Sequence, residues 1–162
     1  MMKKYIYLTS GSEHLFNVSK ELYEKKIAEP VLWLGHHSHE KKASEFFGDI
    51  VLKDLTIRHR IYELKNISYL GEHQDFFASV NYLRSKDRCL KMMDRLDFIG
   101  TFNRLDREIY FHYLVIWTLK HLHKTKPDVL VSPEAPHDWP KYLIYEICLY
   151  LDIPCYKFFN WN

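Results

Sequence analysis

The chain has 162 residues, which suits one domain and leaves no room for a second domain of full size. Hydrophobic residues make up 47% of it and charged residues 27%, a composition that excludes a disordered tail. The 23 Lys and Arg residues nearly balance the 21 Asp and Glu residues, so the net charge of +2 gives no chain-wide field for nucleic acid or an anionic membrane. Any anion site must therefore be local.

The sequence predicts neither a membrane span nor a leader. The longest apolar stretch, from Tyr142 to Leu151, is broken by Glu146 and is shorter than the roughly 20 residues that cross a bilayer. The basic start of the chain continues directly as a β-strand, unlike a signal peptide. Cys89, Cys148 and Cys155 have no metal-site spacing, so we expect reduced thiols in a cytoplasmic protein.

The first third of the chain alternates strands and helices. A β-branched and aromatic run predicts a strand over residues 4–9, and an apolar stripe at Leu15, Val18 and Leu22 predicts the helix that follows. Pro30 is expected to end that helix. Three further elements complete a βαβαβ order: a strand over 31–34, a helix around 41–47 and a strand over 49–52.

The rest of the chain continues the alternation after an ambiguous stretch. Within residues 56–81, Ile57, Ile61 and Leu64 have helical spacing while residues 66–71 break it, so the boundaries stay open. Helices are expected over 86–96 and 105–123, the second apolar on most sides and therefore buried by its neighbours. A strand over 128–131, a helix capped by Asp138 that ends near Asp152, and a strand over 155–159 follow in that order.

Strands separated by helices require crossover connections, which build parallel sheets. We therefore expect an α/β fold: one Rossmann-like three-layer domain over residues 1–162, with a parallel sheet of about five strands in the order 3-2-1-4-5. In such sheets, ligands bind beyond the carboxyl ends of the strands. Three loops follow strands there: SGSEH after the first, GHHSHE after the second and SPEAPHD after the fourth.

The loop after the first strand is suited to bind a substrate oxygen. Gly11 permits a sharp turn and Ser12 can cap a helix whose free N–H groups favour an anion or a sugar oxygen. We assign Gly11, Ser12 and Glu13 to substrate binding. His14 lies on the first turn, and an imidazole suits a general base that deprotonates an acceptor hydroxyl. The alternative is a solvent-exposed histidine beside an ordinary cap.

The loop after the second strand gathers His36, His37 and His39. A His-x-His pair binds a transition metal only when further ligands converge on it, and none is evident in the sequence. We therefore predict no metal and no cofactor, and expect His36 and His37 to contact substrate.

The loop after the fourth strand is stiffened by Pro133 and Pro136. Glu134 could accept hydrogen bonds from substrate hydroxyls, orient His14, or act as the base if partial burial raised its pKa. A structural role, in which Glu134 satisfies backbone donors of the turn, is the alternative. We also assign His137 to substrate binding.

Two segments, SGSEHLFNVSKEL and PDVLVSPEAPHDWPKYLIYEICLYLDIPC, resemble the N-terminal domain of GT-B glycosyltransferases, particularly those of bacterial capsule and surface-polysaccharide synthesis. The resemblance implies a carbohydrate or lipid-linked acceptor and a first-loop histidine base, which is His14 here. It also implies that the nucleotide-sugar donor binds mainly to a second domain, which these residues lack. The paired glycines of the family are reduced to Gly11.

The sequence thus leads to one hypothesis and one alternative. The hypothesis is a glycosyltransferase N-terminal domain, with His14 as base and Glu134 as its orienter, which transfers sugar only when joined to a donor-binding domain. No nucleic-acid partner is expected. The alternative is a non-catalytic Rossmann-like module that binds a nucleotide or another small anionic ligand. A histidine base and an anion-binding helix start would occupy the same loop, so the sequence leaves both open.

Overall fold

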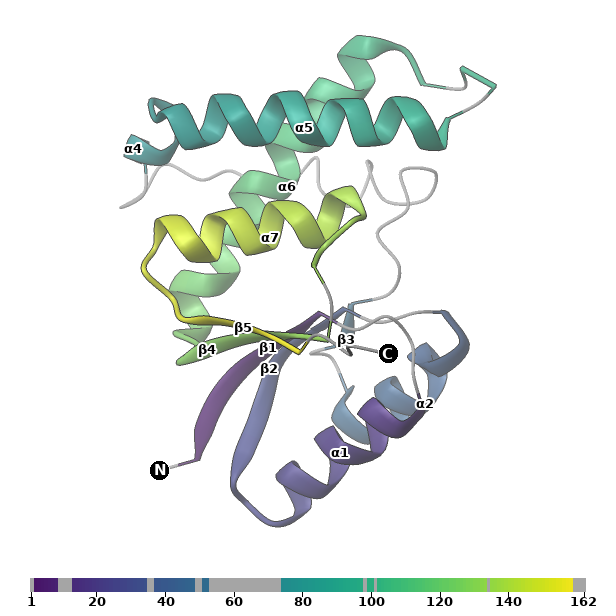
Figure 1. Cartoon of the computed structure of the whole chain (residues 1–162), viewed down its shortest axis with the longest axis vertical. Helices are drawn as coiled ribbons and strands as arrows, with labels where there is room; N and C mark the ends of the chain where they lie inside the picture. The colour runs from purple at the N-terminus through teal and green to yellow at the C-terminus, as the bar shows by residue number, and fades with distance from the viewer. Residues whose placement is uncertain are drawn as a thin grey trace. The chain divides into compact units, whose positions relative to one another are not determined.

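The computed structural model describes residues 2–8, 13–34, 37–48, 51–52, 74–97, 99–100, 102–133 and 135–158, with the side chains of 37–40 and 51–52 excepted. Figure 1 labels its elements along the chain. They are β1 (Lys3–Leu8), α1 (Glu13–Glu24), β2 (Ala28–Leu34), α2 (His37–Phe47), β3 (Val51–Leu52), α4 (Gln74–Phe77), α5 (Val80–Leu96), α6 (Arg104–Thr125), β4 (Val129–Ser132), α7 (Trp139–Tyr150) and β5 (Cys155–Lys157).

The five strands form one sheet in the order β3-β2-β1-β4-β5, and every neighbouring pair is parallel. This confirms the predicted α/β, Rossmann-like class and the predicted strand order. Ile6 of β1 lies opposite Leu32 on one side and Leu130 on the other. The first strand of the chain is therefore central in the sheet.

Three predicted boundaries were wrong. Helix α5 begins at Val80 rather than at residue 86. Pro30 does not end α1, which stops at Glu24, but lies inside β2 opposite Tyr5. A proline has no N–H to donate to the ladder, and the register shifts between Tyr5 and Ile6 directly after this pair. Helix α2 begins at His37 rather than near residue 41, so His37 belongs to the first turn of a helix and not to a loop.

The chain divides into two compact units. The first comprises Met1–Asp54, Thr125–Pro136 and Asp152–Asn162, and holds the sheet with α1 and α2. The second comprises Leu55–Lys124 and His137–Leu151, and holds α4 to α7. The expectation of a single domain over 1–162 stays a prediction.

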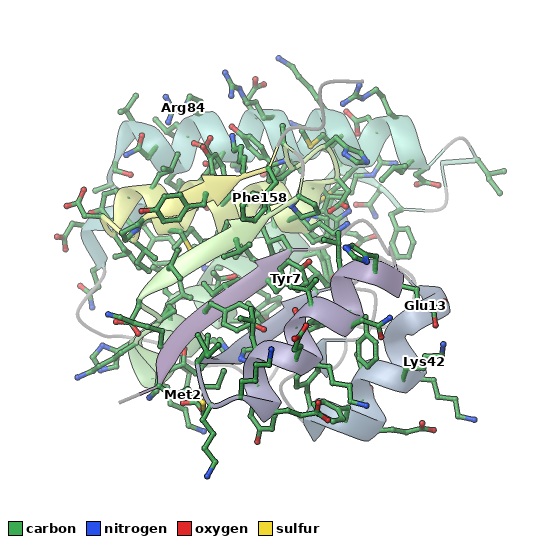
Figure 2. The ribbon with its side chains drawn as sticks, turned by 60° about the horizontal axis from the view of Figure 1, so that its bottom comes forward. Met2, Tyr7, Glu13, Lys42, Arg84 and Phe158 are labelled. Carbon is green, nitrogen blue, oxygen red and sulfur yellow. The ribbon has the colours of Figure 1, made fainter. Side chains whose placement is uncertain are left out.

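An aromatic cluster fills the core on one face of the sheet in the first unit. Tyr7 and Trp33 from neighbouring strands meet edge to face, with ring centroids 4.8 Å apart. Phe16 of α1 packs edge-on against Trp33 at 6.0 Å, and Phe47 of α2 stacks on it at 5.5 Å. Burial of large aromatic surface, with pairs in favourable orientations, fixes α1 and α2 on this face. Tyr7 is labelled on its strand in Figure 2.

The other face of the sheet is also buried. Ile6, Leu8, Leu32 and Leu130 are each 0 or 1% exposed. Side chains alternate between the faces of a strand, so β1 places Tyr7 on one face and Ile6 and Leu8 on the other. Burial on both faces is typical of the central strands of parallel sheets.

Helices α5 and α7 pack antiparallel in the second unit. Three contacts run along them: Arg84 to Glu146 at 2.9 Å, Arg88 to the Tyr142 hydroxyl at 2.8 Å, and the Cys89 thiol to the Trp139 carbonyl at 3.6 Å. Residue numbers rise along α5 as they fall along α7, which sets the antiparallel direction. Figure 1 shows the two helices side by side.

Local signals account for two features of the second unit. Asp138 caps α7 by accepting a hydrogen bond from the backbone N–H of Lys141 at 3.1 Å, and Pro140 lies in the first turn, as the sequence predicts. Helix α6 is largely buried from Tyr110 onward, which confirms for this part the expectation drawn from its apolar residues, whereas Leu105 and Ile109 near its start are exposed. The buried residues include Tyr110, Phe111, Leu114, Val115, Leu119 and Leu122. Over the part of the chain that the structure describes, no helix is long and apolar enough to cross a membrane.

The three cysteines form no disulfide, and burial lowers the reactivity of two of them, Cys89 and Cys155. Cys89 and Cys148 are buried, and Cys155 is partly buried. Burial raises the pKa of Cys155 from 9.0 to about 11, and the pKa of Cys89 still further. Because only the thiolate is a nucleophile, this shift lowers the reactive fraction of Cys155 about a hundredfold at neutral pH.

We predict that a disulfide reagent labels none of the three thiols rapidly in the native protein near neutral pH, and labels all of them in denaturant. Cys155 should react first as the pH is raised towards its pKa of about 11. A raised folded-state pKa means that ionisation favours the unfolded chain, so the stability associated with this thiol is lost as the pH rises from 9.0 to about 11. Fast native labelling at neutral pH would contradict the burial of these side chains.

We also predict that Arg84→Met lowers the free energy of unfolding by about 1 to 3 kcal/mol, because it leaves the Glu146 carboxylate buried without its cation. The Glu146 side chain is 8% exposed. Adding Glu146→Gln should recover part of the loss, since a neutral amide needs no cation. Lys91→Met, which breaks an exposed pair with Asp87, is the matched control and should cost less than about 0.5 kcal/mol. Urea unfolding of the variants measures this; equal losses for Arg84→Met and Lys91→Met would contradict it.

Candidate functional site

The candidate site lies at the carboxyl edge of the sheet in the first unit. Strands β1, β2 and β4 end at Leu8, Leu34 and Ser132. Because all pairs are parallel, the chain leaves these three strands at the same edge. The three loops singled out in the sequence therefore begin at one edge of one sheet, as predicted.

The order of the strands marks one position along that edge. From β1 the chain builds β2 and β3 on one side, then returns to the other side of β1 to build β4 and β5. The order thus reverses between β1 and β4. In open parallel sheets this reversal is where ligands bind, because the loops on its two sides diverge from each other.

Helix α1 brings His14 to this edge. His14 is the second residue of α1, six residues after the end of β1 at Leu8, and its side chain is exposed. Because the side chain of His14 is exposed to solvent on the first turn of the helix, a hydroxyl group of a bound acceptor can reach the imidazole. This placement is compatible with the predicted role of His14 as a general base.

Glu13, the residue before it, makes an ion pair that the sequence does not suggest. Its carboxylate lies 2.6 Å from the ammonium of Lys42 on α2, and both side chains are more than half exposed. Figure 2 shows the two side chains pointing toward each other. The pair connects the first turn of α1 to α2 next to His14. Exposed pairs contribute little stability, about 0 to 1 kcal/mol, so substrate groups can compete for either charge.

The other predicted site residues are described in part or not at all. The backbone of His37 starts α2, and its side chain lies outside the described residues. Gly11, Ser12, His36 and Glu134 also lie outside them. His137 is exposed and directly precedes the Asp138 cap of α7, in the second unit. The roles assigned to all of these residues stay predictions.

Within the described ranges, no three His, Cys, Asp or Glu side chains gather in a way that could hold a metal ion. This search does not extend to the side chains of His36, His37 and His39, on which the metal alternative depends.

Sequence reasoning missed Lys42, the residue that the fold adds to this edge. It lies in the run EKK, which reads as an ordinary solvated helix face. Only the packing of α1 against α2, through the aromatic cluster, brings its ammonium to Glu13. No local signal marks such a contact between residues 29 positions apart.

Comparison with family models, with curated proteins and with solved structures finds no match to this chain.

Proposed function

We propose that this chain is the acceptor-binding half of a GT-B glycosyltransferase of surface-polysaccharide synthesis. The observation that carries the proposal is the strand order. It puts the loop after β1 and the loop after β4 on the two sides of the point where the order reverses. The first of these loops leads into α1, whose second residue is His14, and Glu134 follows β4 in the sequence.

The chemistry of sugar transfer explains why a histidine is needed there. An acceptor hydroxyl has a pKa far above neutrality, so its proton must leave as the new glycosidic bond forms. His14, exposed on the first turn of α1, takes that proton as general base. Glu134 orients the imidazole or the acceptor, and Gly11, Ser12 and the histidines His36, His37 and His137 contact the acceptor.

The partners follow from this division of labour. The chain binds a carbohydrate or a lipid-linked saccharide, while the nucleotide-sugar donor binds mainly to a second domain. The proposed location is the cytoplasm, where a reducing environment keeps thiols free. The lack of a disulfide among Cys89, Cys148 and Cys155 supports this location.

We predict that the isolated chain binds nucleotide-sugars weakly or not at all, because most donor contacts belong to the second domain. Titration calorimetry against UDP-, GDP- and CMP-sugars measures this. Tight, stoichiometric binding would instead favour a small-ligand module, whose anion would lie at the same edge of the sheet.

The central test is the loss of the base. In an enzyme that joins this chain to its donor-binding domain, His14→Ala should lower turnover by about 10²- to 10⁴-fold, the usual contribution of a positioned base. Because His14 is exposed, the variant should fold as the parent does, which circular dichroism checks. His123→Ala, which removes an exposed histidine from the last turn of α6, is the matched control and should leave turnover unchanged.

Glu134→Gln separates the two catalytic roles in the same assay. It should cost less than His14→Ala if Glu134 orients, and at least as much if Glu134 is the base. Full activity of a folded His14→Ala enzyme would remove His14 from catalysis.

A further inference from the structure

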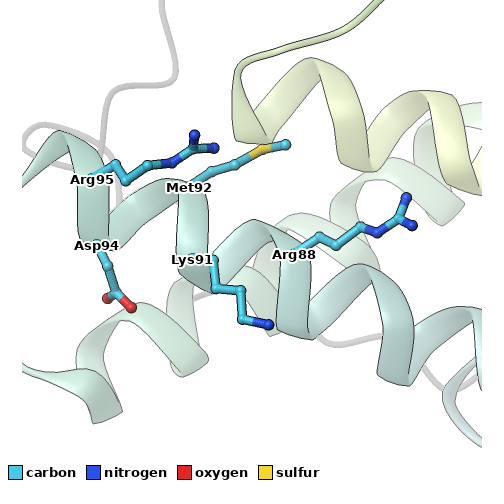
Figure 3. A pocket seen from close by; sticks show the side chains of 5 residues that line it. All are labelled: Arg88, Lys91, Met92, Asp94 and Arg95. Carbon is cyan, nitrogen blue, oxygen red and sulfur yellow. The ribbon is translucent and has the colours of Figure 1, made fainter.

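A shallow hollow on α5 in the second unit is lined by cationic side chains. Its volume is about 490 Å³, and five residues of α5 line it: Arg88, Lys91, Met92, Asp94 and Arg95 (Figure 3). Three of the five are cations and one is an anion. None of these five residues belongs to the proposed acceptor site.

The two arginines are placed to act on one ligand. Arg88 and Arg95 are seven residues apart, about two helical turns or roughly 10 Å of rise, so they lie on the same face of α5. Met92 lies between them, and Figure 3 shows all three side chains extending from α5 in the same direction. Arginine side chains are long enough to converge on one group above the methionine.

The carboxylates around the hollow are already paired with other cations. Four ion pairs account for them: Asp94 with Arg104 at 3.5 Å and also with Arg107, Glu146 with Arg84 at 2.9 Å, and Asp87 with Lys91 at 2.8 Å. Among the residues that the structure describes, neither Arg88 nor Arg95 forms an ion pair with a carboxylate. The Glu146 and Asp87 carboxylates still act on the charge of Arg88 at longer range and offset part of it, whereas no ion pair of Arg95 is found among these residues.

Arg88 is also held in position. Its Nη1 donates a hydrogen bond to the hydroxyl oxygen of Tyr142 at 2.8 Å, and its guanidinium carbon lies 5.8 Å from the centre of the Tyr142 ring. Tyr142 is itself buried, with 8% of its surface exposed. A guanidinium fixed by one N–H keeps its other donors for a ligand and loses less conformational entropy when the ligand binds.

We infer that the hollow between Arg88 and Arg95 binds a phosphate or pyrophosphate group. A planar guanidinium forms paired, charge-assisted hydrogen bonds with phosphate oxygens, which makes arginine the preferred partner for this anion. Met92 and the arginine methylenes supply apolar surface for the organic part of such a ligand. The inference goes beyond the proposed function and does not rest on it, since every residue involved belongs to the second unit and none takes part in proton transfer.

The experiment titrates the whole chain with pyrophosphate by calorimetry at low ionic strength. A parallel arm measures co-sedimentation with vesicles of phosphatidylcholine alone and of phosphatidylcholine mixed with phosphatidic acid. Saturable binding of pyrophosphate without vesicle binding identifies a soluble phosphate ligand. Binding to the phosphatidic acid vesicles, but not to those of phosphatidylcholine alone, identifies the phosphate of a lipid headgroup as the ligand.

Arg95→Gln is the decisive variant, because Arg95 is exposed and its loss leaves the α5–α7 contacts intact. It should weaken binding on the order of tenfold. Arg95→Lys should weaken binding less, because lysine keeps the positive charge and loses only the paired N–H donors of the guanidinium. Tyr142→Phe should cause a smaller loss, since it releases Arg88 without removing it. Lys120→Gln removes one charge from an exposed position on α6 and should leave binding unchanged.

Two results would overturn the inference. One is the absence of saturable binding both to pyrophosphate and to the phosphatidic acid vesicles. The other is an equal loss for Arg95→Gln and Lys120→Gln, which would show attraction to net charge rather than to a site. Thermal unfolding of each variant verifies that the folded state is retained, and the result is independent of any glycosyltransferase assay.

Discussion

The first unit depends on the double pairing of β1. This strand pairs with β2 along one edge and with β4 along the other, and it is buried on both faces. At its start, the carboxylate of Asp128 accepts a hydrogen bond from the backbone N–H of Lys4 at 2.8 Å, which lowers the pKa of Asp128 and joins the amino ends of β1 and β4. Although 120 residues separate β1 from β4 in the chain, this pairing joins the two halves of the sheet, β3-β2-β1 and β4-β5. It also creates the reversal of strand order that locates the candidate site.

Much of this fold could be predicted from the sequence because its signals are local. Apolar strands alternate with amphipathic helices, and that alternation alone implies crossovers and a parallel sheet. The Asp138 cap and the buried character of α6 follow from residues close together in the chain. The boundary at Pro30 failed because the pairing of β2 with β1 outweighs a local rule, and the proline is tolerated beside a register shift. The start of α2 at His37 was missed because histidine has no strong helix preference that would mark it.

Ion pairs between residues that are far apart in the chain could not be predicted from local sequence signals. Lys42 reaches Glu13 only because Phe16 and Phe47 pack α1 and α2 onto the same face of the sheet. Likewise, the basic residues of α5 look like a solvated helix face until it is known which carboxylates each of them meets. A sequence shows how many charges a helix carries, whereas only the packing shows which of them remain uncompensated.

The arginines of α5 show how the packing decides this. Arg84, Arg88 and Arg95 are spaced by four and seven residues and lie on one face of the helix. Arg84 neutralises the buried Glu146, and Arg88 gives one N–H to Tyr142 and keeps the rest. Helix α7 begins at Trp139, whose carbonyl lies level with Cys89, so α7 has no further turn to offer a partner to Arg95. The same residue type therefore stabilises the helix pair at one end of the row and is available to a ligand at the other.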